Sequence, residues 1–375
     1  MTDTPLLSII IPTRERAGTL RYTLETTLAQ NSDAFEVLVS DNCSGDETPE
    51  VVASIRDPRV RYVRADRRLS MCDNYEFALE NSRGRHTIIV GDDDAALPGQ
   101  IDALISRIVG DPTPMIYMWP LHIYDWPSDR APAQLTYFAP AQEPQTVALK
   151  ELAREAVRLG GWKYYALPSG YHSAIPRNLT HEIAARTGRV FHSTQPDVFV
   201  AMALPAFADV ALNLGVPVTM NGRSPKSNGR DFLRKSERRN LDRFIAEYSD
   251  YRFHPMLGTE MSPLAAMIPD AVLRAKDLFP EVYSDVDFGF GEMWAYVARL
   301  GFVSHGEVLR QRKHVDGGRP FSLAKFLGYS ALHQAAAFRR SVLNRVVKPK
   351  GLRKEAPSNI RDTALALSAL ENQRV

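Results

Sequence analysis

Short hydrophobic runs alternate with segments of helical periodicity along the first 120 residues of the chain. The strand-like runs cover residues 6–11, 35–39, 60–63, 86–90 and 115–118. Apolar residues recur at helical spacing in residues 20–28, 48–55, 73–81 and 98–109. Pro98 suits the first turn of the last of these helices, where no N–H is needed. This alternation predicts an α/β fold with a mostly parallel sheet flanked by helices.

Three of the predicted strands end in polar residues. These sets are Thr13, Arg14 and Arg16; Asp41 and Asn42; and Asp92, Asp93 and Asp94. Each set alone is ordinary for a loop, but ligands of such sheets bind at the carboxyl ends of the strands. We therefore expect the three sets to face one crevice and to form a ligand site.

The run Asp92–Asp94 follows Gly91 at the end of a β-branched strand. Three adjacent carboxylates repel one another unless a cation lies nearby, and Mg²⁺ or Mn²⁺ prefers oxygen ligands. The alternative is a solvated acidic turn. No G-x-G-x-x-G or G-x-x-x-x-G-K-[ST] motif is present, which argues against dinucleotide and P-loop sites. A phosphate-bearing ligand would then depend on a metal and on Arg or Lys, as a sugar nucleotide does.

Composition narrows the class of protein. The 375 residues suffice for two domains or for one large domain with an appendage, and 44% are hydrophobic. The net charge of +2 argues against a nucleic-acid binder, and the two cysteines against a disulfide framework. The N-terminus lacks the pattern of a signal peptide, and the most apolar window, 199–218, is interrupted by Pro, Asp and Asn. We expect a cytoplasmic protein.

The motifs of the first 110 residues resemble family 2 glycosyltransferases of the GT-A fold. They are the segments 8–16, 39–44, 73–74 and 91–98. The resemblance implies a Rossmann-like GT-A domain that transfers a sugar from a nucleoside-diphosphate sugar with inversion, using Mn²⁺ or Mg²⁺. The donor is expected to be UDP-linked, and the acceptor a glycan or a lipid-linked saccharide in polysaccharide biosynthesis.

The resemblance also implies roles for single residues. Pro12, Thr13, Arg14 and Arg16 match the turn that contacts the nucleotide, Asp41 the carboxylate that reads the base, and Asp73 or Asn74 a polar residue facing the nucleotide. Asp92–Asp94 match the D-x-D motif, which binds ribose and metal. We expect Asp94 to hold the metal with help from Asp92, although the register is open by one residue.

Asp197 follows Pro196 at the start of an apolar helical segment. A carboxylate in a first helical turn is stabilised by about 0.3–1 kcal/mol, so a simple N-terminal charge is one interpretation. The resemblance implies a second, in which Asp197 is the general base that accepts the proton of the acceptor hydroxyl. The helix N-terminus is expected to keep it ionised.

Two further segments are candidates for substrate contacts. Trp162, Tyr171 and His172 lie in aromatic stretches suited to acceptor binding, or to an ordinary core. Ser224, Lys226 and Ser227 belong to a Gly-flanked segment, 222–229, which resembles a lid over the donor diphosphate or is an ordinary loop. No histidine lies within 222–229, and His254 is the next one, so a third protein ligand for the metal stays open.

We divide the chain into a nucleotide-sugar-binding half (1–120), an acceptor-binding half with the lid (121–230) and a helical, basic C-terminal region (231–375). Residues 321–354 contain no acidic residue. This segment suits peripheral contact with an anionic membrane, a dimer helix, a cap or a solvated basic face. Residues 357–375 are expected to be loosely attached.

Two other functions remain open. A sugar nucleotidyltransferase also uses a parallel sheet and acidic metal ligands, but it would need a Gly-rich loop with a lysine after the first strand. A non-catalytic nucleotide- or glycan-binding relative would keep the same fold without transfer. The sequence does not indicate the oligomeric state.

Overall fold

The computed structural model describes residues 4–129, 131–138, 143–226, 244–248, 251–257, 261, 263–300, 304, 306, 308, 310, 323–332, 334 and 351–372. Among them, no helix combines the length and the apolar character that crossing a bilayer requires.

The larger sheet carries the predicted α/β core. Its strands are β1 (Leu7–Thr13), β2 (Phe35–Asp41), β3 (Val60–Arg64), β4 (His86–Ile89), β6 (Tyr117–Met118), β9 (Gln145–Ala148), β10 (Ser173–Pro176) and β11 (Val210–Asn213). They lie in the order β3-β2-β1-β4-β10-β6-β11-β9. β3, β2, β1 and β4 are parallel, whereas β10 pairs antiparallel with β4 and with β6. The predicted parallel sheet is therefore confirmed, with antiparallel strands added beyond β4.

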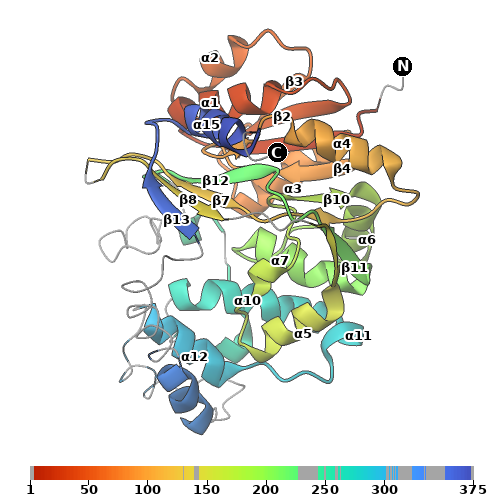
Figure 1. Ribbon diagram of the computed structural model, residues 1–375. Helices are drawn as coiled ribbons and strands as arrows, with labels where there is room; N and C mark the ends of the chain where they lie inside the picture. Colours follow the sequence, from red (N-terminus) through yellow and green to blue (C-terminus); the bar gives the residue numbers. More distant parts are fainter. Residues whose placement is uncertain are drawn as a thin grey trace.

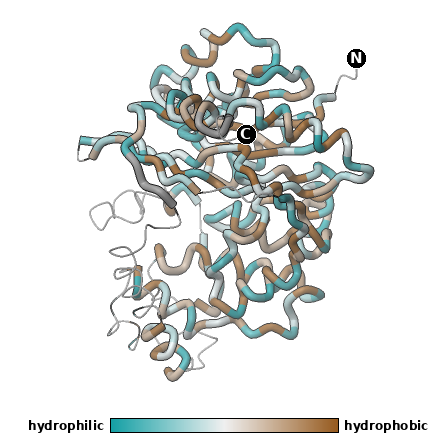
Figure 2. Tube along the Cα trace, viewed as in Figure 1, coloured by the Kyte–Doolittle hydropathy of each residue, from teal (hydrophilic) through white to brown (hydrophobic). Residues whose placement is uncertain are grey.

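Helices cover both faces of this sheet. They are α1 (Ala17–Leu28), α2 (Thr48–Ala53), α3 (Met71–Asn81), α4 (Gln100–Gly110), α5 (Leu149–Arg158), α6 (Arg177–Thr187) and α7 (Pro196–Ala203). One hydrophobic cluster joins β1, β2 and β4 to α1 and α4, and a second joins the other face to α5, α7 and the later helices. Figure 1 shows α1 and α4 on one side of the strands and α7 and α10 on the other. In Figure 2 hydrophobic stretches run through the interior of both halves.

The predicted elements mostly match, but the segment after the acidic run differs. Ala95–Ala96 forms β5, a short strand, and α4 begins only at Gln100. Gly99 precedes that helix with φ +72°, in the left-handed region that glycine tolerates. Pro98 therefore precedes the helix and is not part of its first turn.

A second sheet was not predicted. Its strands are β5, β7 (His122–Asp125), β8 (Gln134–Phe138), β12 (Thr219–Arg223) and β13 (Gly351–Glu355), in the order β13-β8-β7-β12-β5. β12 runs parallel to β7 and antiparallel to β5. Because β5 directly follows the acidic run, this sheet brings β12 against that run.

The C-terminal part contains helices, as expected of a helical region. These are α10 (Pro263–Leu278), α11 (Pro280–Tyr283), α12 (Phe290–Arg299) and α15 (Ile360–Asn372). The expectation that residues 357–375 are loosely attached is wrong for α15. Ile360 and Leu367 are buried against Tyr124 and Met220 of the second sheet, and Arg361 pairs with Glu25 of α1 at 2.8 Å. Figure 1 shows that α15, near the C-terminus of the chain, lies beside α1, near its N-terminus.

Candidate functional site

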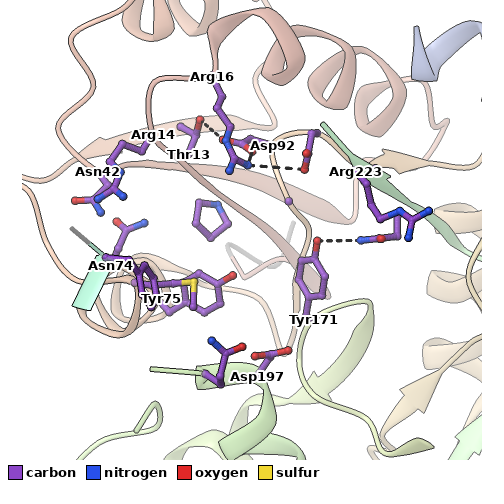
Figure 3. Close-up of a pocket in the computed structure, with 18 of the residues that line it drawn as sticks. Thr13, Arg14, Arg16, Asn42, Asn74, Tyr75, Asp92, Tyr171, Asp197 and Arg223 are labelled. Carbon is purple, nitrogen blue, oxygen red and sulfur yellow. Dashed lines mark hydrogen bonds and ion pairs between the residues drawn. The ribbon is translucent and has the colours of Figure 1, made fainter. Parts of the chain in front are cut away.

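A cavity of about 690 Å³ opens at the carboxyl ends of β1, β2 and β4. Its walls also include the start of α3, the segment before β10, the start of α7, β12 and residues 244–247. Thr13, Asn42 and Asp92 represent the three polar strand ends, and all of them line it. The predicted convergence of these ends on one crevice is therefore observed (Figure 3).

Two loops of the cavity contain residues in the left-handed region that are not glycine. Glu15 has φ +57° in the turn after β1, and Cys43 has φ +56° in the turn after β2. Such conformations cost about 1–3 kcal/mol each and persist only where surrounding contacts hold them. Ser44 provides one such contact, because its hydroxyl accepts a hydrogen bond from the Glu15 amide at 3.0 Å.

Arg16 joins the acidic run to the first turn. It donates a hydrogen bond to Asp92 Oδ1 at 2.8 Å, lies 3.9 Å from Asp93 Oδ1 and donates to the carbonyl of Lys226. Thr13 donates to the other Asp92 oxygen at 2.7 Å. Burial alone would lower the pKa of Arg16, but the two carboxylates outweigh burial and raise that pKa. Arg16 is therefore a fixed cation that offsets part of the acidic charge.

Asp94, the expected metal ligand, lies behind the cavity wall. Its side chain is fully buried, and it accepts hydrogen bonds from the backbone N–H of Gly91 and of Gly222, each at 2.6 Å. Tyr171 donates to Asp94 Oδ2 at 2.7 Å, and His172 Nε2 lies 3.1 Å from the same oxygen. Both oxygens of Asp94 already accept hydrogen bonds from the protein. Asp92 and Asp93, and not Asp94, are the carboxylates of the acidic run that line the cavity.

Asp41, expected to read the base, is also withdrawn from the cavity. Its fully buried carboxylate accepts hydrogen bonds from Tyr62 and Arg64 at 2.6 Å and from the Ser44 amide at 2.9 Å. These contacts give Asp41 a structural role in place of the expected base contact. The next residue, Asn42, lines the cavity instead, with its side-chain amide bonded to the backbone of Leu69.

The two polar candidates on α3 differ in placement. Asn74 is buried, lines the cavity and accepts a hydrogen bond from Ser40 at 3.1 Å. Asp73 lies on the outer side of the helix, where it pairs with Arg189 at 2.8 Å and bonds to the capping Ser70. Of the pair, only Asn74 is positioned to contact a ligand in this cavity.

Asp197 is the second residue of α7 and lines the cavity (Figure 3). Burial raises the pKa of its carboxyl group, and the backbone N–H groups of Val198 and of Asp197 itself oppose this only in part. The expected effect of the helix N-terminus is thus present, but burial outweighs it. A carboxylate with a raised pKa is a stronger base than an exposed one.

The aromatic candidates divide into wall and core. Tyr171 lines the cavity. His172 is buried behind it. Trp162 is partly buried against the second hydrophobic cluster and stacks on Tyr296, with ring centroids 3.4 Å apart. For Trp162 the structure therefore supports the core interpretation. Tyr75 and Tyr164 also line the cavity. Tyr75 was missed because an aromatic residue at helical spacing has the same pattern as a core residue, whereas Tyr164 belongs to the same aromatic stretch as Trp162.

Part of the expected lid is described. The Ser224 amide donates to Asp93 Oδ2 at 2.9 Å, and Lys226 Nζ donates to the carbonyl of Glu15 at 3.2 Å. Ser227 lies outside the described residues. His254 is buried and bonds to Asp277 and Asp270, and it does not line the cavity.

Other cavity residues came from segments that carried no motif. Phe244 and Glu247 cover the side near Arg14, where Arg14 and Glu247 pair at 2.7 Å. Arg223 of β12, which belongs to the Gly-flanked segment 222–229, pairs with Asp125 of β7 at 2.8 Å. Because β7 belongs to the unpredicted second sheet, no local sequence signal linked Asp125 to the strand ends.

The acidic character of the cavity bears on metal binding. Among the described residues, no group of three or more His, Cys, Asp and Glu side chains is arranged to hold a metal. Five carboxylates nevertheless line the cavity against three guanidinium groups. An anionic diphosphate would be repelled there without an added cation, and Mg²⁺ is commonly held by one or two carboxylates together with substrate phosphates. Asp92 and Asp93 fit a shared site of that kind.

Comparison with known proteins agrees with these motifs. Residues 8–161 match the family model described as Glycosyl transferase family 2. The succinoglycan biosynthesis protein ExoO of Rhizobium meliloti (strain 1021) is 33% identical over 103 residues, which are 28% of this chain and 30% of ExoO. The GalNAc(5)-diNAcBac-PP-undecaprenol beta-1,3-glucosyltransferase of Campylobacter jejuni is 28% identical over 106 residues, 28% of this chain and 34% of that protein.

The chain thus spans about a third of the length of these curated relatives. A solved structure, S. aureus TarS 1-349 in complex with UDP-GlcNAc, is 13% identical with a TM-score of 0.49, covering 89% of this chain and 91% of TarS. The family match confirms the resemblance found in the motifs of the first 110 residues.

Proposed function

We propose that this chain, whose residues 8–161 form a glycosyl transferase family 2 domain, transfers a sugar from a nucleoside-diphosphate sugar to an acceptor hydroxyl with inversion. One observation carries the proposal: the same cavity is lined by Asp92 and Asp93 at the strand ends and by Asp197 at the start of α7. The donor diphosphate is proposed to lie against the first pair. The acceptor hydroxyl then lies beside Asp197.

The nucleotide is proposed to lie along the ends of β1 and β2. Asn42 and Asn74 line that part of the cavity, and Arg14 lines it as well. We retain a uridine donor as the proposal for the base. The acceptor is proposed to be a glycan or a lipid-linked saccharide, as the name of the undecaprenol-linked relative says of that protein.

A divalent ion held by Asp92 and Asp93 would supply positive charge to the leaving diphosphate when bound. Two groups of the protein orient the carboxylates that would hold this ion. Arg16 holds Asp92 in place, and the Ser224 amide fixes Asp93 at 2.9 Å, so both carboxylates are oriented before the donor arrives. Such preorganisation avoids rearrangement during the reaction.

Asp197 is proposed as the general base. It takes the proton of the acceptor hydroxyl while the oxygen of that hydroxyl forms a bond to the anomeric carbon. The bond from that carbon to the diphosphate oxygen breaks, and its electron pair leaves with the diphosphate. Attack opposite the leaving group inverts the anomeric configuration. Holding both reactants in this geometry can lower the activation barrier by up to about 7–11 kcal/mol.

Thermal unfolding in the presence of single nucleoside diphosphates, with and without Mn²⁺, tests the proposal. At a hundredfold excess over Kd, a ligand that binds only the native state stabilises it by about 2.7 kcal/mol. We expect a metal-dependent rise in Tm with one nucleotide and sugar transfer from the matching donor. Binding without transfer to any acceptor would favour a non-catalytic relative, and no shift with any nucleotide would refute the donor site.

A further inference from the structure

The carboxylate of Asp94 connects three separate segments of the cavity wall. It accepts hydrogen bonds from Gly91 after β4, from Tyr171 before β10 and from Gly222 in β12. Asn221 Nδ2 lies 3.4 Å from Asp94 Oδ1 and 3.3 Å from the Tyr171 oxygen. A buried carboxylate with this many hydrogen-bond donors holds the three segments in one arrangement.

His172 continues the hydrogen-bond network of Asp94 away from the cavity. Its Nε2 lies 3.1 Å from Asp94, and its Nδ1 lies 2.7 Å from the hydroxyl of Thr219, which also accepts a hydrogen bond from Trp119. His172 has φ +53°, in the left-handed region that is costly for a histidine. The contacts of both ring nitrogens hold it there, which fixes the neighbouring Tyr171 as well.

Close packing leaves Tyr171 little freedom. A Cβ added at Gly91 would lie 2.9 Å from the Tyr171 oxygen and 2.8 Å from Asp94 Oδ2. Burial and the Asp94 carboxylate raise the pKa of Tyr171 well above its ordinary value, so the phenol keeps its proton. Since that proton is donated to Asp94 and Asn221 donates to the oxygen at 3.3 Å, one lone pair of the oxygen is left to accept a further hydrogen bond.

Figure 3 shows Tyr171 between Asp92 on one side and Asp197 on the other. In the proposed function, the diphosphate lies near Asp92 and the attacking hydroxyl near Asp197. The sugar that is transferred must then lie between them, beside the Tyr171 hydroxyl.

We propose that Tyr171 contacts the transferred sugar of the donor and selects it through a hydrogen bond from a sugar hydroxyl, with Asp94 and His172 as positioning residues. This assignment rests on the proposed function and reassigns two residues. Tyr171 acts on the donor sugar and not on the acceptor, and Asp94 orients a side chain and does not bind the metal.

The test compares two ligands that differ only in the sugar. Binding of a nucleoside diphosphate and of the matching nucleoside-diphosphate sugar is measured by calorimetry with Mn²⁺, for the wild type and for Tyr171→Phe. We expect the variant to bind the diphosphate as the wild type does and the sugar nucleotide about three- to tenfold more weakly. Its preference between donors epimeric at one sugar hydroxyl should fall by a similar factor.

His172→Gln tests the positioning role. We expect a weaker loss of sugar-nucleotide affinity in the same direction, with unchanged Mn²⁺ dependence of diphosphate binding. Equal loss for both ligands, or no loss in Tyr171→Phe, would overturn the inference. If His172→Gln does not fold, the Tyr171→Phe comparison decides alone. If the wild type binds no nucleotide at all, the proposed function itself fails, which is a distinct outcome.

Discussion

Replacing Asp94 by asparagine separates a structural carboxylate from a metal ligand. Both side-chain oxygens of Asp94 face a backbone N–H at 2.6 Å, from Gly91 on one side and from Gly222 on the other. An asparagine has one carbonyl oxygen and one NH₂ group. Whichever way the amide is oriented, its NH₂ group faces the backbone N–H of either Gly91 or Gly222, and that one buried donor loses its acceptor.

The expected cost follows from these contacts. A buried donor without a partner costs about 1–3 kcal/mol, and the repulsion between that donor and the facing NH₂ group adds to this cost. The total stability of a protein is commonly about 5–15 kcal/mol, so the loss is a large fraction of it. The contact of the carboxylate with His172 Nε2 at 3.1 Å is changed in addition.

Asp93→Asn is the matched control, because Asp93 is nearly as buried but lines the cavity. The carbonyl oxygen of an asparagine there can still accept the hydrogen bond from Ser224, so we expect a loss of at most about 1–2 kcal/mol. Its effect should appear in function, as loss of the metal-dependent part of nucleotide binding.

Urea unfolding measures the stability of both variants, and nucleotide binding with increasing Mn²⁺ measures function. Burial alone would raise the pKa of Asp94, but His172, Tyr171 and the Gly222 amide outweigh it and lower that pKa. The ionised carboxylate therefore stabilises the fold above its unfolded pKa of about 3.9, and this contribution disappears as the pH falls through the lower folded value. The stability difference between wild type and Asp94→Asn should persist down to about pH 4.

The reverse pattern would refute this reasoning. If Asp94→Asn unfolds within about 1 kcal/mol of the wild type and loses metal-dependent binding, while Asp93→Asn keeps that binding, Asp94 is the metal ligand after all.

Three further predictions follow from other contacts. Asp197→Asn should abolish transfer and keep nucleotide binding, and an unchanged rate in the variant would exclude the base role. In the wild type burial raises the pKa of this carboxyl group, so kcat/KM should fall on acidification through a pKa above the ordinary value of about 3.9. Gly222→Ala would bring a Cβ within 1.6 Å of a backbone carbonyl oxygen, so urea unfolding should show a free energy of unfolding lower by about 1–3 kcal/mol. The control Gly18→Ala meets no atom within 4 Å and should be neutral or stabilising, so equal effects of the two substitutions would refute the packing argument. Leu367→Ala should cost about 2 kcal/mol in the same assay because Leu367 is buried in α15, whereas the exposed Leu365→Ala should cost almost nothing. An equally small cost for Leu367→Ala would mean that α15 detaches in solution.

The sequence alone indicated the first half of the fold and the location of the site. Strands β1 to β4 follow from short hydrophobic runs, and a parallel arrangement follows from the helices between them. Once the strands are parallel, their carboxyl ends must share one edge of the sheet. The convergence of Thr13, Asn42 and Asp92 on one cavity was therefore predictable from local pattern.

The sequence did not decide which carboxylate of the acidic run faces the cavity. Asp93 and Asp94 are neighbours of the same type, and their difference arises from partners 77 to 128 residues away along the chain. The second sheet, built from β5, β7, β8, β12 and β13, brings Gly222 to Asp94. Short strands of this kind carry little periodicity of their own, so their pairing depends on the packed structure.

The same distinction explains Asp41, Asp197 and α15. Their residue types and local positions were evident in the sequence, but burial by distant segments determined their environment. Local periodicity specifies secondary structure because each residue needs only its near neighbours for it. The protonation of a carboxyl group, its hydrogen-bond partners and its access to a ligand depend on which distant groups exclude water from it, and only the tertiary structure decided those.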